Sequence, residues 1–287
     1  MKKVLFIMVL AASMLHVSAK TALVVIAHGA PSDEWNRPVL NIEKILNQVE
    51  IPGISYKRVA LMEFSNPNIN TVVKDCEKEG IDTIFALPLF IAPSSHSEDD
   101  IPNILGLKYD PVTRRVLAEE KAEIVKSHIC FIVGPTLMSS DMIEKTMLQR
   151  IKEMSKDTKN EAVLLLAHGD PERIGFWESI LKKTGDYIKA NTGIDYVDAR
   201  LVGMGYTFSK DVNPILTKVA AEKKRILVQG IYLMSSVSDM AKMAKMNEKQ
   251  KNIKSEIVYS EYGILPKSTP EICQWIVETT KDWLKNK

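Results

Sequence analysis

Two histidines in the first half of the chain each follow an apolar run of strand length. His28 ends the run VVIAH, and His96 comes shortly after the run ALPLFIAP. Runs that are apolar throughout indicate parallel strands buried on both faces, and the ends of such strands meet at one edge of an open α/β sheet. Two imidazoles at that edge could hold a divalent cation and leave coordination positions open. Each histidine taken alone could instead be an ordinary strand-end or capping residue.

A carboxylate in the same half could complete this set. Glu63 lies in RVALMEFSNP, just past another apolar run. It could act as a third metal ligand or accept a proton, although a single glutamate at a strand end is usually solvated. Asp99 and Asp100 follow His96 and open the next helical segment. We expect them to have a structural role there, because acids are favoured in the first turn of a helix.

The second half of the chain repeats part of this pattern. LLLAHGDP at 164–171 matches VVIAHGAP at 24–31, and His168 follows His28 by 140 residues. Two copies at this offset indicate a duplicated domain. The repeat raises the question of whether both copies keep the groups that chemistry requires.

The other candidate groups are missing from the second copy. Val237 stands where His96 stood, and Met204 or Gly205 replaces Glu63. A valine cannot bind a metal. We therefore expect the second histidine to be structural or to lie at the rim of the site, with the chemistry confined to the first half.

Both halves alternate apolar runs with amphipathic stretches, which is typical of parallel sheets with helices on both faces. The expected strands lie near 22–27, 54–61, 83–90, 129–133, 162–167, 196–202, 225–233 and 255–260. The expected helices lie near 38–49, 67–79, 140–155, 174–191, 211–223, 236–248 and 270–285, with a short one after His96. Together they predict an α/β protein with one parallel sheet in each half.

One segment of the first half, at 106–127, has no counterpart in the second and is predicted to be an insertion. Its AEEKAEIVK portion is prone to form a helix, whereas the remainder could form a mobile flap beside the site or a solvated excursion. The three cysteines Cys76, Cys130 and Cys273 match no metal motif. We expect buried free thiols, with a disulfide as the alternative in an oxidising compartment.

The N-terminus resembles an export signal. Lys2 and Lys3 precede a short apolar stretch, and small residues follow up to Ala19. We expect residues 1–19 to be removed, which would leave a periplasmic protein; the alternative is a first buried strand. The apolar stretch is too short to span a bilayer, so we expect no stable membrane insertion. The net charge of +2 and the scattered basic residues argue against nucleic-acid binding.

AHG after the first strand, LMEFSNP, and PLFIAPSSHSEDDIP together resemble the sirohydrochlorin cobaltochelatase family of class II tetrapyrrole chelatases. This resemblance implies two tandem flavodoxin-like, chelatase-like domains, at 20–138 with the active site and at 139–287 with a degenerate site. It also implies a lyase that inserts Co²⁺, or else Ni²⁺ or Fe²⁺, into a sirohydrochlorin-like tetrapyrrole. The metal ligands of the family map onto His28 and His96, and its acidic partner onto Glu63. We expect no organic cofactor, and a homo-oligomer is neither required nor excluded.

Neutral imidazoles would hold the metal, and one of them or Glu63 would accept the protons that leave the macrocycle. Arg37 or Lys57 could meet substrate carboxylates at the rim, but both could equally be solvated surface residues. The main alternative is an exported protein that binds a metal or a metallotetrapyrrole without turnover, which the export signal favours. A third hypothesis is removal of metal from scavenged tetrapyrroles.

Overall fold

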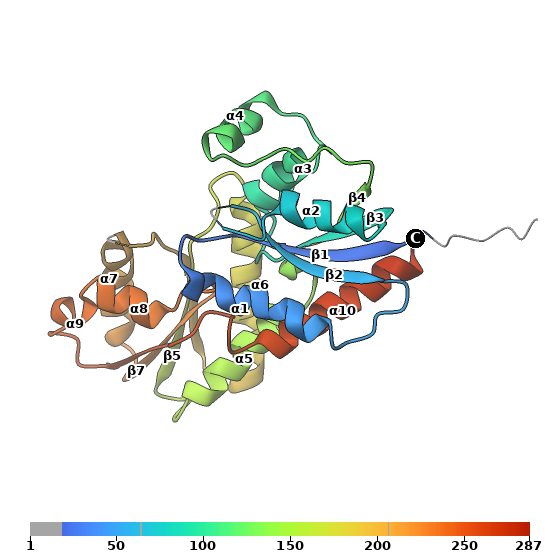
Figure 1. Ribbon diagram of the computed structural model, residues 1–287. Helices are drawn as coiled ribbons and strands as arrows, with labels where there is room; N and C mark the ends of the chain where they lie inside the picture. Colours follow the sequence, from blue (N-terminus) through green and yellow to red (C-terminus); the bar gives the residue numbers. More distant parts are fainter. Residues whose placement is uncertain (1–18, 64, 206) are drawn as a thin grey trace, which may run out of the picture.

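The computed structural model describes residues 19–63, 65–205 and 207–287, so that the expected export segment lies outside the described residues except for Ala19. Two four-stranded sheets dominate the fold (Figure 1), and every strand pair in them is parallel. The first sheet has the order β2-β1-β3-β4 and the second β6-β5-β7-β8, so the second half repeats the topology of the first. The predicted α/β class with one parallel sheet per half is confirmed.

The strand bounds agree with the apolar runs to within a few residues. They are β1 (Thr21–Ala27), β2 (Tyr56–Leu61), β3 (Thr83–Pro88), β4 (Cys130–Val133), β5 (Glu161–Ala167), β6 (Tyr196–Leu201), β7 (Arg225–Gly230) and β8 (Glu256–Tyr259). The order places β1 and β3 side by side in the first sheet and β5 and β7 side by side in the second. The loops that follow β1 and β3 therefore leave the same edge of the sheet.

Helices cover both faces of each sheet (Figure 1). The larger ones are α1 (Asp33–Leu46), α2 (Ile69–Lys78), α4 (Pro111–Glu119), α5 (Met142–Met154), α6 (Ile174–Thr192), α7 (Thr207–Ala220), α8 (Val237–Met243) and α10 (Thr269–Lys285). The shorter ones are the π-helical turn η1 (His96–Asp100), α3 (Ile101–Ile104), the 3-10 turn η2 (Leu137–Ser139) and α9 (Met246–Lys249).

One hydrophobic core joins the two halves. The alternate residues Leu23, Val25 and Ala27 of β1 belong to the same buried cluster as Val163 and Leu165 of β5. Ala22, Val24 and Ile26 of β1 and Ala162, Leu164 and Leu166 of β5 pack into two separate outer cores. A strand that fills a core on both faces must be apolar at every position, which explains why β1 and β5 read as unbroken apolar runs.

The last helix crosses back to the first half. α10 packs against α1, and Trp283 near its end stacks on Phe85 of β3 with ring centroids 4.4 Å apart. Lys287 Nζ lies 3.4 Å from Thr21 Oγ1 at the start of β1. α5 instead packs against α6 and β7 of the second half. The chain therefore passes between the halves once before α5 and again before α10.

The helix in the 106–127 segment begins earlier than expected. It covers Pro111–Glu119 instead of AEEKAEIVK, because the Asp110 carboxylate accepts the backbone N–H groups of Val112 and Thr113 and so fixes the start. It ends at Glu119 with Glu120 as the C-cap, and Lys121 has a φ of 61°. The capping group thus outweighs the helix propensity of the later residues.

Two smaller expectations were also wrong. The helix expected at 236–248 is divided into α8 and α9, and Lys245 between them has a φ of 52°. The cysteines are free, but Cys130 is exposed at the start of the edge strand β4, where one side of the strand has no neighbour. Within the described ranges, no helix is both long and apolar enough to cross a membrane.

Candidate functional site

His28 follows β1 directly and is held at both ring nitrogens. Its Nδ1 lies 2.6 Å from the backbone oxygen of Gly29, and its Nε2 lies 2.7 Å from Glu63 Oε1. A carbonyl oxygen can only accept, so Nδ1 carries the proton in this contact. Gly29 allows the arrangement, since a Cβ atom there would come within 1.8 Å of the Glu63 backbone oxygen.

The loop after His28 is fixed by buried Asn36 on α1. The Asn36 side chain accepts the backbone N–H of Ala30 at 3.0 Å and donates to the Ala30 carbonyl at 2.8 Å. Ser65 Oγ donates to the same carbonyl at 2.7 Å. These bonds join the loops that follow β1 and β2, which are the loops that carry His28 and Glu63.

His96 reaches the same edge from the π-helical turn that follows β3. Its Nδ1 lies 2.7 Å from Asp100 Oδ2, four residues later. The bond to Asp100 leaves Nε2 as the nitrogen available to a metal, an arrangement typical of metal-binding histidines. Asp100 was expected to stabilise a helix start, but its side chain makes no capping bond. The contact between Asp100 and His96, which the sequence reasoning missed, lies in a π-helical turn, a feature that is frequent at functional sites.

The structure brings His28, Glu63 and His96 together. Their ligand atoms all lie within 4.8 Å of one another, and the two imidazole rings meet edge to face with centroids 5.1 Å apart. Among the described residues, these three form the only group of at least three His, Cys, Asp or Glu side chains with this spacing. Both histidines are half-buried and Glu63 is nearly buried, so the group could hold a divalent cation and keep one side open.

Burial and hydrogen bonding oppose each other at His28. Burial alone lowers its pKa, but the hydrogen bond that the ring donates to Glu63 and the contact with the Gly29 carbonyl outweigh it, and the pKa is raised above 6.5. The Glu63 carboxylate thus favours a positively charged partner at Nε2. Such a partner is a proton at low pH and could be a metal ion at higher pH.

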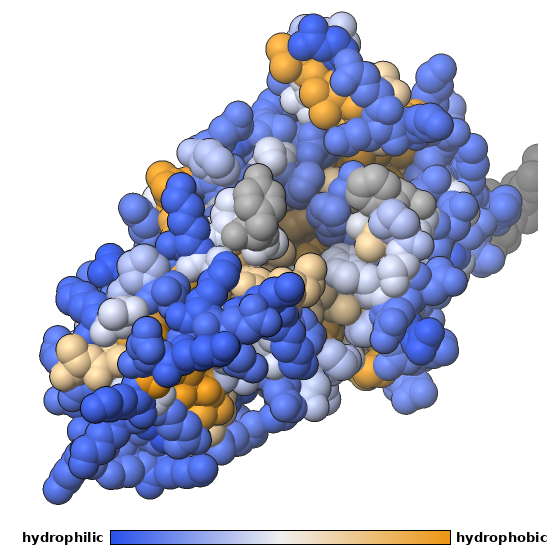
Figure 2. All heavy atoms as spheres, turned by 90° about the vertical axis from the view of Figure 1, so that its left-hand side faces the viewer, coloured by the Kyte–Doolittle hydropathy of each residue, from blue (hydrophilic) through white to orange (hydrophobic). Residues whose placement is uncertain are grey.

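A cleft of about 540 Å³ lies beside this group, between the two halves. Figure 2 shows a hollow between the halves with hydrophobic residues at its floor. His28, Trp35 and His96 line the cleft from the first half, and His168 and Trp177 line it from the second. A concave apolar site with a few polar groups on one wall is typical of small-molecule sites.

His168 occupies the position expected from the repeat, without the other two groups. Its Nδ1 lies 2.5 Å from the backbone oxygen of Gly169, as in the first copy. Its ring contacts Trp177 and Tyr232, with centroids 4.9 and 5.8 Å away. Among the described ion pairs, none involves His168, and Val237 is fully buried. The second copy therefore contributes to the cleft wall a histidine that packs on aromatic rings, without the carboxylate and second histidine of the first copy.

Two contacts connect the halves next to His96. The backbone N–H of Ser95 donates to Asp170 Oδ2 at 3.0 Å, and Arg173 Nη2 lies 2.8 Å from Asp99 Oδ2. Asp99 was expected to favour a helix start, but its carboxylate pairs with Arg173 across the cleft. The sequence gives no local signal for either contact, because the partners are more than 70 residues apart.

The 106–127 insertion lies beside the candidate metal ligands. Glu120 and Glu123 line a hollow of about 330 Å³ together with Glu63. Partial burial raises the pKa of Glu120, and the negative charges of Glu63 and Asp100 raise it further. The insertion residues that line this hollow thus belong to the AEEKAEIVK portion, for which a helix was expected, and not to the remainder that was considered as a flap.

Neither cation suggested for the rim lines the cleft. Lys57 lies near the start of β2, at the opposite end of the strand, and its ammonium donates to the Val49 carbonyl at 3.0 Å. Arg37 lines a separate hollow along α1, with Lys44. The type of a side chain does not indicate which end of a strand or which side of a helix it occupies. For this reason the sequence could not show that Lys57 and Arg37 lie away from the cleft.

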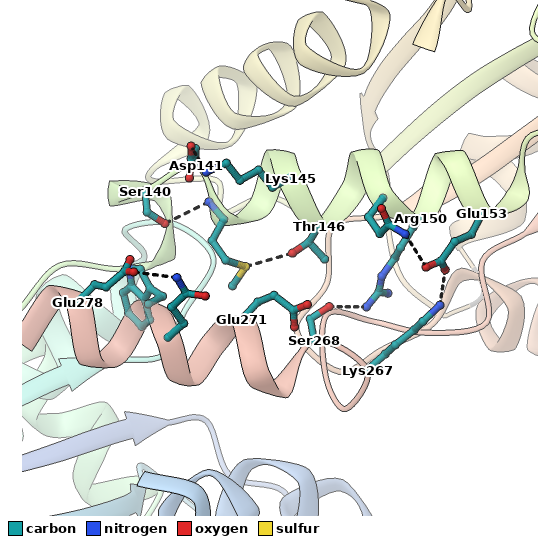
Figure 3. Close-up of a pocket in the computed structure, with 14 residues that line it drawn as sticks. Ser140, Asp141, Lys145, Thr146, Arg150, Glu153, Lys267, Ser268, Glu271 and Glu278 are labelled. Atoms are coloured by element: carbon teal, nitrogen blue, oxygen red, sulfur yellow. Dashed lines mark hydrogen bonds and ion pairs between the residues drawn. The ribbon is translucent and has the colours of Figure 1, made fainter. Parts of the chain in front are cut away.

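Another cavity, of about 550 Å³, lies between α5 and α10 (Figure 3). Its polar side chains bind one another: Lys267 pairs with Glu153, and Arg150 donates to Ser268 Oγ at 3.0 Å (Figure 3). Arg150 also donates to the backbone carbonyls of Tyr262, Gly263 and Ile264. Several of its polar side chains thus belong to the contact between α5, α10 and the segment before α10.

Comparisons with known proteins agree with this architecture. The sequence profile of the CbiX family matches residues 22–154. A sirohydrochlorin cobaltochelatase of Methanococcus maripaludis is 33% identical over 86 residues, which are 30% of this chain and 58% of that protein. One from Saccharolobus islandicus is 21% identical over 131 residues, which are 46% of this chain and 93% of that protein. The chain thus spans little more than half the length of the first of these relatives.

The similarity in structure extends over both halves. SirB from Bacillus subtilis, solved with Fe³⁺, superposes with a TM-score of 0.67 at 14% identity and covers 92% of this chain and 95% of its own. This likeness concerns the fold, whereas the sequence match concerns the half that contains His28, Glu63 and His96. Residues 22–154 therefore match the CbiX family profile, and the described chain as a whole has a two-sheet fold similar to that of SirB.

Proposed function

We propose that this chain inserts a divalent metal ion into a tetrapyrrole, with Co²⁺ as the metal to test first. The observation that carries the proposal is the convergence of His28, Glu63 and His96 beside the cleft, with ligand atoms within 4.8 Å of one another. Imidazole nitrogens and a carboxylate suit Co²⁺, Ni²⁺ and Fe²⁺ alike. Two similar folds have been solved with different metals, SirB of Bacillus subtilis with Fe³⁺ and SirB with cobalt.

The three side chains have distinct parts in this reaction. His28 and His96 would hold the metal through neutral nitrogens on one wall of the cleft, while Asp100 orients the His96 ring. Metal insertion also requires two pyrrole N–H protons to leave the macrocycle. As the metal moves to the macrocycle nitrogens, His28 Nε2 and the Glu63 carboxylate would each lose the metal as a partner and could each accept one of these two protons.

Purified protein, Co²⁺ and a metal-free porphyrin test the proposal directly. The visible spectrum should change to that of the metallated product over many turnovers. His96→Ala should abolish turnover, whereas His168→Ala should keep most of it. His128→Ala is the matched control, because His128 is exposed and lies outside the cleft. Equal losses in His96→Ala and His168→Ala would contradict a single working half.

A second candidate is an exported protein that binds a metallotetrapyrrole without turnover. It is favoured by the positions of His28 and His168, which line the cleft from opposite halves and could bind a metal from both faces of a macrocycle. Tight binding of one equivalent of product, with no metallation beyond that amount, would select this candidate. We propose export in either case from the N-terminal sequence, and mass spectrometry of the secreted protein should find Lys20 at its N-terminus.

A further inference from the structure

The described lining residues of the cleft include neither lysine nor arginine, and Asp170 is their only carboxylate. A sirohydrochlorin-like tetrapyrrole, the substrate class expected from the sequence, carries carboxylates on every pyrrole ring. Burying such a group without a partner is strongly unfavourable. A substrate of this class therefore needs cations at the rim of the cleft, where its carboxylates leave the apolar interior.

Two cations lie at this rim, and both contact the carboxylate of Asp99. Arg173 Nη2 lies 2.8 Å from Asp99 Oδ2, and Lys108 Nζ contacts Oδ1 of the same carboxylate. Asp99 belongs to the turn η1 together with the lining residue His96, and Arg173 follows the lining residue Asp170 by three positions. We call Asp99, Lys108 and Arg173 the rim cluster. One carboxylate is thus shared by a cation of the second half and a cation of the 106–127 insertion.

The backbones of both cations are fixed independently of their side chains. The Lys108 backbone N–H donates to the Pro102 carbonyl at 3.1 Å, and Arg114 Nη2 donates to the Lys108 carbonyl at 3.2 Å. The Arg173 backbone N–H donates to the Asp170 carbonyl at 3.0 Å. Either side chain can therefore exchange one acceptor for another by rotation about its own bonds, while the loop that carries it stays in place.

The rim cluster is open enough for a ligand to reach it. The exposed fractions of the side chains are 46% for Lys108, 26% for Arg173 and 18% for Asp99. Replacing the Asp99 carboxylate by a ligand carboxylate leaves each cation with a charged partner, and the ligand carboxylate gains charge-assisted hydrogen bonds. The exchange therefore removes the cost of an unpaired ligand charge without leaving an unpaired cation on the protein.

We infer, on the basis of the proposed function, that Arg173 and Lys108 form a subsite for a carboxylate of the tetrapyrrole and that Asp99 competes with that carboxylate for them. The macrocycle would lie in the cleft with its centre toward His28 and His96, and a carboxylate at its edge would reach the rim cluster. This subsite joins the second half to the insertion through the substrate. It thereby gives the 106–127 segment a part in substrate recognition.

Removal of the competing carboxylate tests this inference. The full chain and its Asp99→Asn variant are titrated with uroporphyrin, which is octacarboxylic, and with deuteroporphyrin, which is dicarboxylic, and quenching of tryptophan fluorescence gives each dissociation constant. Asp99→Asn should bind uroporphyrin about three- to tenfold more tightly, because both cations remain and their competitor is gone. The binding of deuteroporphyrin should tighten less. If Asp99 served only to hold the halves together through Arg173, the variant would bind both porphyrins more weakly, which would overturn the inference.

Removal of a cation should have the opposite effect. Lys108→Met should weaken uroporphyrin binding about two- to fivefold, the effect expected for one partly exposed charge pair, and Lys108→Arg should restore it. The effect on deuteroporphyrin should be smaller, since it has fewer carboxylates to present. An unchanged affinity for uroporphyrin in Lys108→Met would also overturn the inference.

A surface ion pair far from the cleft supplies the matched controls. Lys285 Nζ lies 3.0 Å from Asp282 Oδ1 in the last turn of α10. This turn is close to the start of β1, where Lys287 contacts Thr21, whereas His28 follows the end of β1. Asp282→Asn and Lys285→Met should leave the affinity for both porphyrins unchanged. Co²⁺ affinity should be nearly unchanged in every variant; if Asp99→Asn loses Co²⁺ binding, the Lys108 variants decide the inference.

The outcomes separate this inference from the proposed function. Metal insertion into uroporphyrin by the unmodified chain, with weaker uroporphyrin binding in Asp99→Asn, would overturn the inference and leave the chelatase proposal standing. Tighter uroporphyrin binding in Asp99→Asn, without insertion of Co²⁺ into either porphyrin, would support the inference and contradict the chelatase proposal.

Discussion

His28 Nε2 and Glu63 Oε1 lie 2.7 Å apart, although the two residues follow different strands. The contact exists because β1 and β2 are parallel neighbours, with Ala27 beside Leu61 in the register. Parallel neighbours end at the same edge of a sheet, so the residues just beyond them meet. The contact between His28 and Glu63 therefore follows from the position of β1 beside β2 in the sheet.

This pair predicts how metal binding depends on pH. Protons and metal compete for His28 Nε2, and Glu63 raises the pKa of His28 above 6.5. Co²⁺ affinity should therefore be full well above that pKa and should fall about tenfold per pH unit below it for each proton displaced. Calorimetric titration between about pH 5.5 and pH 8.5 measures this dependence.

Glu63→Gln separates the two effects of the carboxylate. It should weaken Co²⁺ binding at high pH through loss of a ligand and move the pH at which affinity begins to fall to a lower value. The shift is expected because the raised pKa of His28 depends on Glu63. Affinity that does not change with pH in the unmodified protein would contradict the assignment of His28 as a ligand.

Asp100→Asn should lower Co²⁺ affinity by about 10- to 100-fold, because carboxylate partners orient metal-binding imidazoles and raise their basicity. Glu98→Gln is the control in the same turn, where Glu98 is exposed and its carboxylate accepts a hydrogen bond from Ser97 Oγ. Equilibrium dialysis against Co²⁺ gives both affinities. If Asp100→Asn binds as tightly as the Glu98 variant, Asp100 does not position His96.

Arg173→Met should weaken porphyrin binding about two- to fivefold, the effect expected for loss of a partly exposed ion pair that holds the halves together. Co²⁺ binding should be unchanged, because His28, Glu63 and His96 all belong to the first half. Arg200→Met is the control, since Arg200 pairs with Asp198 inside the second half. Equal effects of the two variants on porphyrin binding would show that the contact between Arg173 and Asp99 does not help to hold the two walls of the cleft together.

Arg150→Met should lower the free energy of unfolding by about 2–4 kcal/mol, because it leaves several buried carbonyl groups without a donor. The Arg150 side chain is 4% exposed and binds three consecutive carbonyls, from Tyr262 to Ile264. Lys152→Met is the control on the exposed side of α5. Urea unfolding should separate the two variants, and similar midpoints would contradict this role of Arg150.

The arrangement of sheets and candidate ligands could be predicted from the sequence because each depends on a local signal. An apolar run such as β1 has to be buried on both faces, and the residue after it has to lie at the edge of the sheet. That reasoning found His28, His96 and Glu63, which the structure brings together. Their role as metal ligands stays a prediction.

The remaining features depend on partners that no local pattern specifies. Asp100 reaches His96 because the chain forms a π-helical turn there, and an ordinary helix start is equally consistent with HSEDD. The bond between Ser95 and Asp170 joins residues 75 positions apart. In the insertion, the Asp110 cap determined where the helix begins, although the later residues have the higher propensity.

Helix α5 packs on the second half of the chain, and helix α10 packs back on the first half. This arrangement affects how the chain could be cut into two fragments. A chain cut near residue 139 would separate α10 from the Phe85 and α1 surface that it covers, because Trp283 stacks on Phe85 from the far end of the sequence. Two separately expressed fragments should then recover the fold only when mixed. Although the two halves repeat one sheet topology, each then lacks part of its covering without the other, so neither half should fold fully when expressed alone.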